Sequence, residues 1–543
     1  MTSTQSSSSL DMKRGGARVR ELAKGIHGFL TVFIALLFFS QYVFAQDPLS
    51  RSVVKIFTSC LKPNSYLPWQ IGAQYNGGGS GSIIAGRRIL TNAHVVSNQV
   101  YIQVQKAGDS RRYTANVEHV AHDCDLALLK ISDEAETDLF FEGTQPIELG
   151  GIPKRLDEVV AYGFPVGGNE LSTTKGVVSR VEVRLYEHSN KLLLAIQISA
   201  VLNPGNSGGP VIMDGRLVGV AFEKMVGIKV EGIGYIIPVP IIEHFLKDLE
   251  DGMYGGFPWI GILAENMESQ SMRNFYGMGS DDTGVLVTKV FYGSSAWGVL
   301  EEDDVLLAID TVNVNNDGTV RFRENEKLDY ADLITRRQVG ENLDIRVLRH
   351  GKEMSLSMRL VGWSKPLVPG PQYDVLPTYY IFAGLVFQPL SYDYINDYVM
   401  LLGDPPVEFT NLYLYGEASD GHMEITKEVE SKAIPSVSKK IKEIVILGSV
   451  LVHDINIAYH EMGNVIVRRI NGKEISNMKD VIEAFRTPSG GYHFIEFNQG
   501  VDKPRIIIDA DRASAATYEI MEKYDIQNNC SADLRGDASC ISR

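Results

Sequence analysis

Short alternating or β-branched runs dominate the chain between residues 52 and 239. Gly, Asn and Asp, which favour turns, separate these runs from one another. In chain order they are SVVKIFT, GGGSGSIIAGRRILTNAHVV, QVYIQVQ, YTANVEHVA, DLALLKIS, DEVVAYGFP, TTKGVVSRVEVR, LLLAIQISA, GRLVGVAFE and GIGYIIPV. Many short strands with few helical stretches predict a mainly β barrel or sandwich.

A helical pattern closes this first module. In PIIEHFLKDLEDG the apolar residues Ile242, Phe245, Leu246 and Leu249 share one face of a helix. The composition then changes at DGMYGGFPWIGI, and a proline-rich stretch, KPLVPGPQYDVLP, marks a second boundary. These breaks predict a first domain over 48–252, a second over 256–363, a linker over 364–378, a third domain over 379–510 and a tail over 511–543.

The first 45 residues have the order of a secretory signal peptide. A polar stretch with five Lys and Arg residues precedes the apolar run FLTVFIALLFF, and Val43 and Ala45 occupy the −3 and −1 positions of a cleavage site. The same segment is nearly long enough to remain as a membrane anchor. Both alternatives predict that the rest of the chain lies outside the cytoplasm, as in a periplasm or a secretory compartment.

Charge and cysteine content narrow the possible partners. The 543-residue chain has a formal net charge of −15 and no long basic run after its N-terminus, which argues against nucleic acid as a partner. Cys530 and Cys540 are close enough in sequence to staple the C-terminus, whereas pairing of Cys60 with Cys124 depends on the fold. The cysteines and histidines lack zinc-like spacing, and no Walker-type loop is present, so neither a metal nor another cofactor is expected. His119 and His122 are expected to be exposed loop residues.

Three residues spaced along the first module suggest nucleophilic catalysis. Ser207 lies in the glycine-rich NPGNSGGP, His94 follows a strand in ILTNAHVV, and Asp125 precedes the strand in CDLALLKI. Taken singly, these are a turn serine, a structural histidine and a turn aspartate. A serine hydroxyl becomes an effective nucleophile when a base, itself held by an acid, takes its proton. The chain order His, Asp, Ser is that of the chymotrypsin-like double barrel.

Six motifs in the same order resemble the trypsin-like domain of HtrA/Deg serine proteases. They are GSGSIIAGRRILTNAHVV, DCDLALLKI, AYGFPVGG, TTKGVVSR, NPGNSGGPVI and GIGYIIPV, within residues 52–250. The resemblance implies a double β-barrel serine endopeptidase in which His94 is the general base, Asp125 orients it and Ser207 is the nucleophile. It also implies an oxyanion hole made by the N–H groups of Gly205 and Ser207, with Asn206 between them shaping the loop.

The resemblance also suggests where the primary substrate pocket lies. Leu202 matches a pocket-lining position, and Gly234, Gly219 and Val220 would form other walls. Such an apolar pocket would favour cleavage after small or medium aliphatic residues. The alternative is that these side chains belong to the barrel core.

The downstream modules resemble PDZ domains, which makes the expected architecture a double β-barrel followed by two PDZ-like α+β domains. In the second domain, Trp259, Ile260, Gly261 and Ile262 of FPWIGI would hold a peptide C-terminus, although the insert over 322–334 could alter or cover the groove. The third domain resembles a diverged PDZ whose FAGLVF, residues 382–387, matches the carboxylate loop, but residues 392–442 make peptide binding there doubtful. This arrangement is most similar to the plant-type Deg subgroup.

Together these features predict an ATP-independent endopeptidase that cleaves unfolded or misfolded extracytoplasmic proteins. The resemblance implies homo-oligomers built from trimers, and protease loops, here 163–174, 184–191 and 222–232, that switch between states. Peptide binding to a PDZ groove would bias the loop around Tyr186 toward the active arrangement. The alternatives are a peptide-binding chaperone or scaffold with a resting protease domain, and a membrane-tethered regulatory protease.

Overall fold

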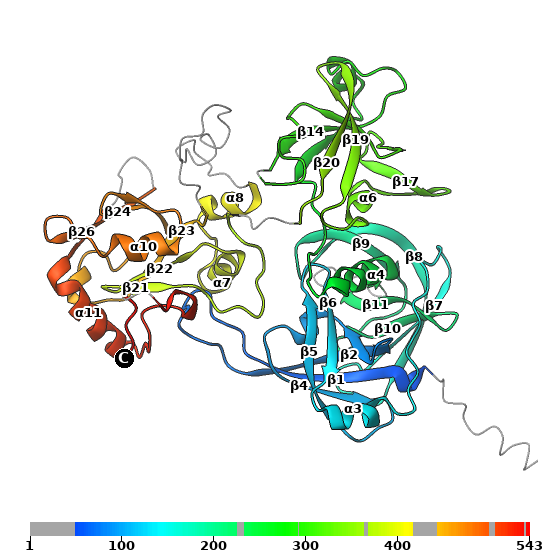
Figure 1. Cartoon of the computed structure of the whole chain (residues 1–543), viewed down its shortest axis with the longest axis horizontal. Coiled ribbons are helices and arrows are strands. Elements are labelled where there is room, and N and C mark those ends of the chain that lie inside the picture. The colour runs from blue at the N-terminus through cyan, green and yellow to red at the C-terminus, as the bar shows by residue number, and fades with distance from the viewer. Residues whose placement is uncertain are drawn as a thin grey trace, which may run out of the picture.

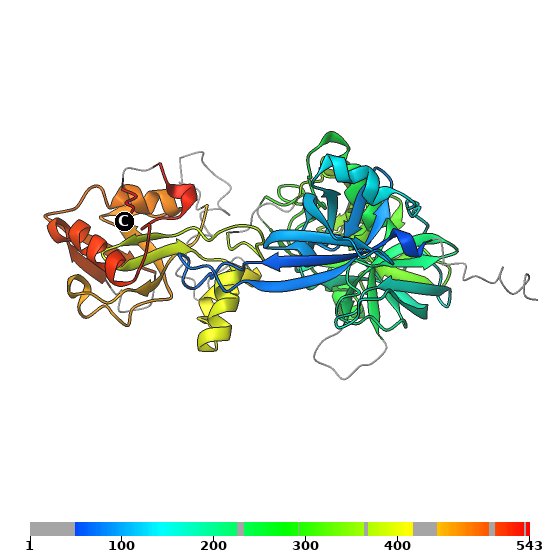
Figure 2. The same cartoon turned by 90° about the horizontal axis from the view of Figure 1, so that it is seen from below.

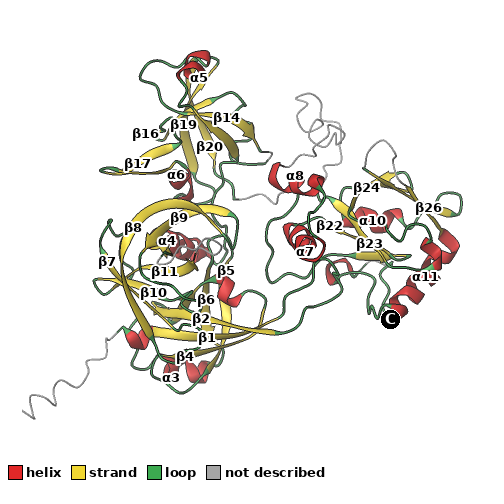
Figure 3. Ribbon diagram, turned by 180° about the vertical axis from the view of Figure 1, so that it is seen from behind, coloured by secondary structure: helices red, strands yellow, loops and turns green. Residues whose placement is uncertain are grey.

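The computed structural model describes residues 49–224, 233–291, 293–362, 367–415, 442–498, 505–536 and 539–543. The predicted signal segment and most of the predicted loop over 222–232 lie outside these residues. Two closed six-stranded barrels are followed by two domains built on open sheets (Figures 1 and 3). The predicted mainly β fold with a double barrel is therefore confirmed. No helix in the described ranges is long and apolar enough to cross a membrane.

The first barrel closes around a core to which its first strand contributes alternate residues. On its first strand, Val54 and Ile56 are buried while Lys55 and Phe57 are only half-buried, so one face of the sheet curls around the core. The strand order is β1-β2-β3-β6-β5-β4. Its elements are η1 (Ser50–Ser52), β1 (Val53–Cys60), β2 (Tyr75–Ile84), β3 (Arg88–Thr91), α2 (Ala93–Val96), β4 (Gln99–Lys106), β5 (Tyr113–Ala121), β6 (Leu126–Ile131) and α3 (Glu134–Phe141).

The second barrel has the strand order β10-β11-β12-β9-β8-β7. Its elements are β7 (Glu158–Gly163), β8 (Ser172–Tyr186), β9 (Lys191–Ile198), β10 (Pro210–Met213), β11 (Arg216–Lys224), β12 (Gly234–Pro238), α4 (Val239–Asp248) and η2 (Leu249–Asp251). The predicted closing helix is confirmed as α4, which buries Ile242 and Phe245 in a core shared by the two barrels. This shared core fixes the barrels against each other, and the residues on the loops at their junction are held with them.

The second domain is a sheet of order β13-β14-β15-β19-β20, in which β13 is an edge strand and β16 pairs with β15. The insert forms a separate hairpin, β17–β18, followed by the short helix α6. The elements are β13 (Ile262–Asn266), α5 (Gln270–Phe275), β14 (Val285–Val290), β15 (Val305–Ile309), β16 (Val312–Asn313), β17 (Thr319–Arg323), β18 (Glu326–Asp329), α6 (Ala331–Thr335), β19 (Asn342–Arg349) and β20 (Lys352–Arg359).

The third domain is a sheet of order β21-β22-β23-β24-β26-β27, with β25 paired to β24. Its elements are β21 (Tyr380–Phe382), β22 (Leu385–Pro389), α7 (Tyr392–Leu402), α8 (Val407–Tyr415), β23 (Val445–Val450), η3 (Asp454–Asn456), β24 (Val465–Ile470), β25 (Lys473–Glu474), α10 (Met478–Ala484), β26 (Tyr492–Phe497), β27 (Arg505–Asp509), α11 (Ala510–Lys523) and η4 (Ala532–Leu534).

The segment after residue 510, predicted as a C-terminal tail, belongs to this third domain. Helix α11 buries Ala516, Ile520 and Met521 in the domain core, since its apolar residues fall on one face. Beyond it, a disulfide joins Cys530 to Cys540, the pairing that their spacing suggested. Cys60 and Cys124 are free and buried.

Aromatic contacts help to hold the third domain beside the protease. The segment between β1 and β2, blue in Figures 1 and 2, reaches out of the first barrel to the third domain. There the Tyr66 ring stacks on Tyr394 at 5.8 Å, and Trp69 meets Tyr379 edge-on at 6.3 Å. Such aromatic contacts typically contribute about 1 kcal/mol each beyond their buried area.

Candidate active site and peptide loops

The strand end of β3 brings His94 next to Asp125. β3 pairs with β6, which sets Thr91 opposite Ala127, so the turn after one strand lies beside the start of the other. Buried Asn92 reinforces this juncture, because its side-chain amide donates to the Asp125 carbonyl at 2.9 Å. Asp125 itself adopts a left-handed φ of +55°, a conformation that aspartate tolerates better than most residues.

The Asp125 carboxylate uses both oxygens to hold His94. Oδ2 lies 2.7 Å from His94 Nδ1, and the His94 backbone N–H donates to Oδ1 at 2.8 Å. Burial raises the pKa of the Asp125 carboxyl, but the charge and hydrogen bonds of His94 lower it more, and the net pKa lies below its ordinary value. An ionised Asp125 places the ring proton on Nδ1, which leaves Nε2 of His94 as a proton acceptor.

The Ser207 loop is pinned across the barrel junction by Ser80 of β2. The Ser80 hydroxyl donates to the Gly205 carbonyl at 2.8 Å and accepts from the N–H of Phe164 at 2.8 Å, while the Ser80 N–H donates to the Ser207 carbonyl at 2.8 Å. A Cβ added to Gly79 would lie 2.8 Å from the Ser207 carbonyl oxygen and 2.7 Å from Val95, the residue after His94. The serine loop and the histidine turn therefore meet at the same stretch of β2.

The backbone of this loop presents two free donors. Gly205 has a φ of +99° and Gly208 a φ of +83°, conformations open chiefly to glycine. Within the part of the chain that the structure describes, the N–H groups of Gly205 and Ser207 donate no hydrogen bond. The Asn206 N–H donates instead to the Asn203 carbonyl at 2.9 Å. Asn206 thus shapes the loop, and only its two neighbours have N–H groups available for an oxyanion.

Of the four predicted pocket residues, the structure brings two together. Leu202 lies flat over Gly234, since a Cβ added to Gly234 would sit 2.7 Å from two Leu202 side-chain carbons. Val220 is fully buried in the core between the barrels, and a Cβ on Gly219 would meet the Ile237 carbonyl at 2.7 Å. Val220 and Leu202 belong to different core clusters. Val220 thus lies in the core between the barrels, and a part for Gly219 and Val220 in a substrate pocket stays a prediction.

The predicted peptide loop of the second domain is shaped around Gly261. This glycine has a φ of +74°, and a Cβ there would fall 2.0 Å from the Ser294 Cβ. The carbonyls of this loop all accept hydrogen bonds from the segment 291–296. The Trp259 carbonyl accepts from the Ser295 hydroxyl at 2.7 Å, the Ile260 carbonyl from the Ala296 N–H at 3.0 Å, and the Gly261 carbonyl from the Phe291 N–H at 2.9 Å. The N–H groups of Ile260 and Gly261 donate to none of the described residues. Because Ile262 starts the edge strand β13, a peptide can add to this sheet.

The insert of the second domain contacts the protease domain. The Arg323 guanidinium donates to the carbonyls of Ile152 and Pro153 at 2.8 and 2.9 Å, and Leu328 is buried in the core shared by the barrels. The hairpin therefore fastens the second domain to the second barrel.

The equivalent loop of the third domain is already satisfied within the chain. The Ala383 N–H donates to the Thr517 hydroxyl at 2.8 Å, and the Ile381 N–H donates to the Asn529 carbonyl at 2.7 Å. The disulfide-stapled C-terminal segment thus covers the edge of β21. FAGLVF therefore resembles a carboxylate loop in sequence, but these contacts occupy the strand edge that a peptide would need.

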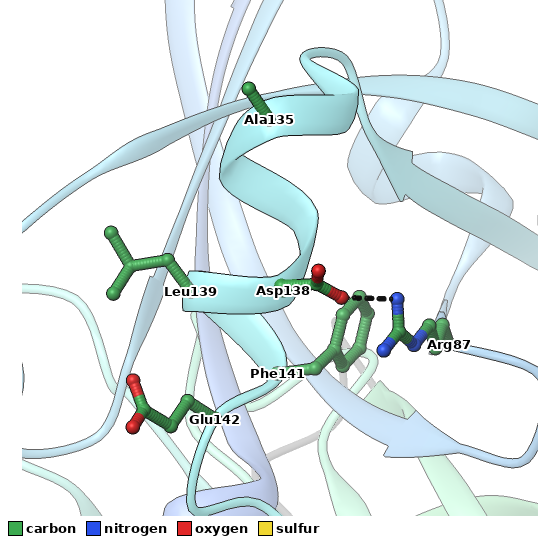
Figure 4. Close-up of a pocket in the computed structure, with 6 residues that line it drawn as sticks. All are labelled: Arg87, Ala135, Asp138, Leu139, Phe141 and Glu142. Carbon is green, nitrogen blue, oxygen red and sulfur yellow. Dashed lines mark ion pairs between the residues drawn. The ribbon is translucent and has the colours of Figure 1, made fainter.

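A surface hollow beside α3 has no share in this chemistry. It is lined by Arg87, Ala135, Asp138, Leu139, Phe141 and Glu142 and crossed by an exposed Arg87–Asp138 ion pair of 2.7 Å (Figure 4). None of the predicted catalytic or binding residues lines it.

Comparisons with known proteins agree with this geometry. The trypsin-like peptidase domain profile matches residues 79–220, and a PDZ domain profile matches residues 368–533. "Protease Do-like 4, mitochondrial" of Arabidopsis thaliana is 40% identical over 438 residues, covering 80% of this chain and 77% of that protein. "Putative protease Do-like 3, mitochondrial" of the same plant is 38% identical over 500 residues, covering 90% and 81%.

The chain belongs to the Do-like, or HtrA/Deg, family of serine proteases. It is a serine endopeptidase with a trypsin-like domain and a PDZ domain. Among solved structures it is similar to "HtrA-type protease AlgW with decapeptide", with a TM-score of 0.44 at 22% identity, covering 59% of this chain and 98% of that one.

Two histidines near the site of this protease form a contact that the sequence does not predict. His122 is not an exposed loop residue: its Nδ1 lies 3.0 Å from Nε2 of His188, and its Nε2 lies 3.0 Å from Oδ2 of Asp374. His119 also differs from the expectation, since it is half-buried on β5. His188 lies between β8 and β9, and Asp374 on the linker, so no local pattern could reveal the cluster.

Lowering the pH from 7.5 to 5 is expected to loosen the linker from His188. Burial lowers the pKa of His188 to about 4, and nearby His94 and His122 add to this, while Asp125 and Asp374 oppose it. When the linker is released, His188 is protonated below about pH 6.5, whereas with the linker bound it is protonated only below about pH 4. Binding of the linker therefore weakens as pH falls, by about 2 kcal/mol at pH 5. Hydrogen exchange of residues 370–376, corrected for intrinsic rates, measures this loss.

His188→Asn is the control for this pH effect, because it removes the titrating group. In this variant the protection of residues 370–376 from hydrogen exchange should not change between pH 7.5 and 5. Equal protection of the linker at pH 7.5 and 5 in the unaltered protease would contradict the prediction.

Proposed function

We propose that this protease cleaves peptide bonds with His94, Asp125 and Ser207 as its catalytic triad. The observation that carries the proposal is the two-point hold of Asp125 on His94, beside a Ser207 loop in which the N–H groups of Gly205 and Ser207 donate to none of the described residues. His94 takes the proton of the Ser207 hydroxyl as the serine attacks the scissile carbonyl, and later returns it to the leaving amine. Asp125 stabilises the imidazolium that forms in between.

The negative oxygen of the tetrahedral intermediate would be held by the N–H groups of Gly205 and Ser207. Donors of this kind each contribute about 3–4 kcal/mol to lowering the barrier when they are oriented in advance. The contacts of Ser80 provide that orientation, since they hold the carbonyls on either side of Asn206 from the opposite barrel. The apolar contact of Leu202 with Gly234 supports a pocket for small or medium aliphatic side chains.

The proposed substrates are unfolded proteins and peptides in an extracytoplasmic compartment, cleaved without ATP by a homo-oligomer built from trimers. The Cys530–Cys540 disulfide supports an oxidising location, and the two plant relatives carry names that place them in mitochondria. Peptide C-termini would bind at Ile260 and Gly261, whose N–H groups face no partner among the described residues. Mass measurement of the mature N-terminus distinguishes a cleaved signal from an anchor.

Ser207→Ala is expected to abolish hydrolysis of unfolded casein by the purified protease. The substitution removes the attacking oxygen and leaves the His94–Asp125 pair in place. Casein cleavage is followed for both proteins from parallel preparations. Equal cleavage by the two would mean that another residue or a contaminant is responsible.

A further inference from the structure

The linker between the second and third domains crosses the protease domain next to the His94–Asp125 pair. The Tyr373 ring stacks on His188 with centroids 3.9 Å apart and planes at 16°, and its hydroxyl donates to the His188 carbonyl at 2.8 Å. The same ring stacks on His122 at 4.8 Å. Tyr373 therefore covers two histidines at once, one from each barrel.

These two histidines flank the predicted acid and base. The His188 ring centroid is 6.2 Å from that of His94, and His122 precedes Asp125 by three residues. Next to Tyr373, Asp374 accepts from His122 and exchanges hydrogen bonds with Asn98, which holds the linker to the first barrel. The linker and the two histidines thus form one layer over the carboxylate side of the pair.

Beside this layer the acid is buried and the base stays partly open. The Asp125 side chain is 2% exposed, whereas the His94 side chain remains 34% exposed. A linker that blocked substrate access would bury the His94 imidazole together with the Asp125 carboxylate. Excluding water from the carboxylate strengthens its hold on His94, because the attraction between opposite charges increases as the local dielectric constant falls.

Resting on the proposed triad, we propose that Tyr373 is a positioning residue for catalysis, which the linker supplies from outside the trypsin-like domain. Its ring keeps His122 and His188 packed over Asp125, and so keeps the His94–Asp125 pair dry and correctly oriented. The contacts of Tyr66 and Trp69 with the third domain hold the linker in place.

Tyr373→Ala in the full chain is expected to lower kcat by about tenfold to 100-fold with KM changed less than about twofold. The substrate is a fluorogenic peptide built on a cleavage site mapped in casein. With water beside Asp125 its field on His94 weakens, so the pKa of His94 falls and the acid limb of the kcat/KM profile moves to lower pH. Tyr373→Phe, which keeps the ring stack, should restore both kcat and the profile.

Tyr413→Ala is the matched control, because it removes another tyrosine contact with the β8–β9 loop without touching the two histidines. Its kcat should stay within about twofold of that of the unaltered protease, because the orientation of His94, on which the activation barrier depends, does not change. If Tyr373→Ala does not fold, as thermal unfolding would show, Tyr373→Leu is measured instead, since it keeps most of the side-chain volume.

Four results would overturn the proposal. An unchanged kcat in Tyr373→Ala would mean that the linker has no part in catalysis, and a raised kcat would mean that it inhibits the protease. A raised KM alone would mean that Tyr373 contacts the substrate. An equal loss in Tyr413→Ala would assign the effect to domain docking in general. Failure of the proposed triad is distinguishable, because it would appear as equal cleavage by the Ser207→Ala protein whatever residue stands at 373.

Discussion

Replacing Asp125 by asparagine is expected to lower kcat by about 10,000-fold while KM changes little. The neutral amide can still lie beside His94, but it no longer stabilises the imidazolium, and it can hold the ring in the tautomer with the proton on Nε2. Nε2 is the atom that must accept the Ser207 proton. The measurement is kcat and KM on the fluorogenic peptide, with thermal unfolding to confirm that the fold persists.

Asp133→Asn provides the control for this change. Asp133 caps α3 in the same barrel by accepting from the Ala135 N–H at 2.9 Å, which asparagine also does. It should leave kcat unaltered. A loss of less than about tenfold in Asp125→Asn would contradict the assigned role, because the tautomer argument requires far more.

Replacing Gly205 by alanine is expected to lower kcat by about 100-fold to 1,000-fold through the oxyanion hole. The new Cβ would fall 2.4 Å from the Phe164 carbonyl oxygen and 2.8 Å from the Val166 nitrogen, at a φ of +99°. The backbone must therefore shift, and the N–H groups on either side of Asn206 turn away from the position where charge develops. Phosphonylation of Ser207 by a phosphonofluoridate, in which the serine oxygen displaces fluoride from phosphorus, is followed beside kcat and reports the same loss without a peptide substrate.

Gly215→Ala separates this effect from the general strain of a left-handed alanine. Gly215 has a φ of +78° in the turn between β10 and β11, and a Cβ there meets nothing within 4 Å. It should lower stability by about 1 kcal/mol and leave kcat unaltered. A normal kcat in Gly205→Ala would mean that the hole is formed elsewhere.

The second domain shows how far a motif alone can be taken. FPWIGI predicts a peptide loop, and the structure shows the reason for its glycine, which approaches Ser294 too closely for any side chain. The insert after it packs Leu328 into the protease core. The sequence does not predict this contact, because the apolar positions of a hairpin do not specify which surface receives them, and the expectation that the insert alters or covers the groove stays a prediction.

The sequence by itself determined the features that depend on local order. Alternating apolar residues dictate the barrel strands, the face shared by Ile242 and Phe245 dictates α4, and six ordered motifs point to the family and to His94, Asp125 and Ser207. These signals are readable because each lies within a few residues along the chain, where backbone geometry fixes which side chains share a face.

Only the tertiary structure decided which distant segments meet. It turned Val220 into the core, paired the C-terminal segment with β21 through the backbone bridge of Cys530 to Tyr380, and laid Tyr373 across His122 and His188. The last contact joins segments separated by 185 and 251 positions, so no periodicity records it. Such contacts form when whole domains pack together. The packing free energy comes from many residues along the chain and not from one motif.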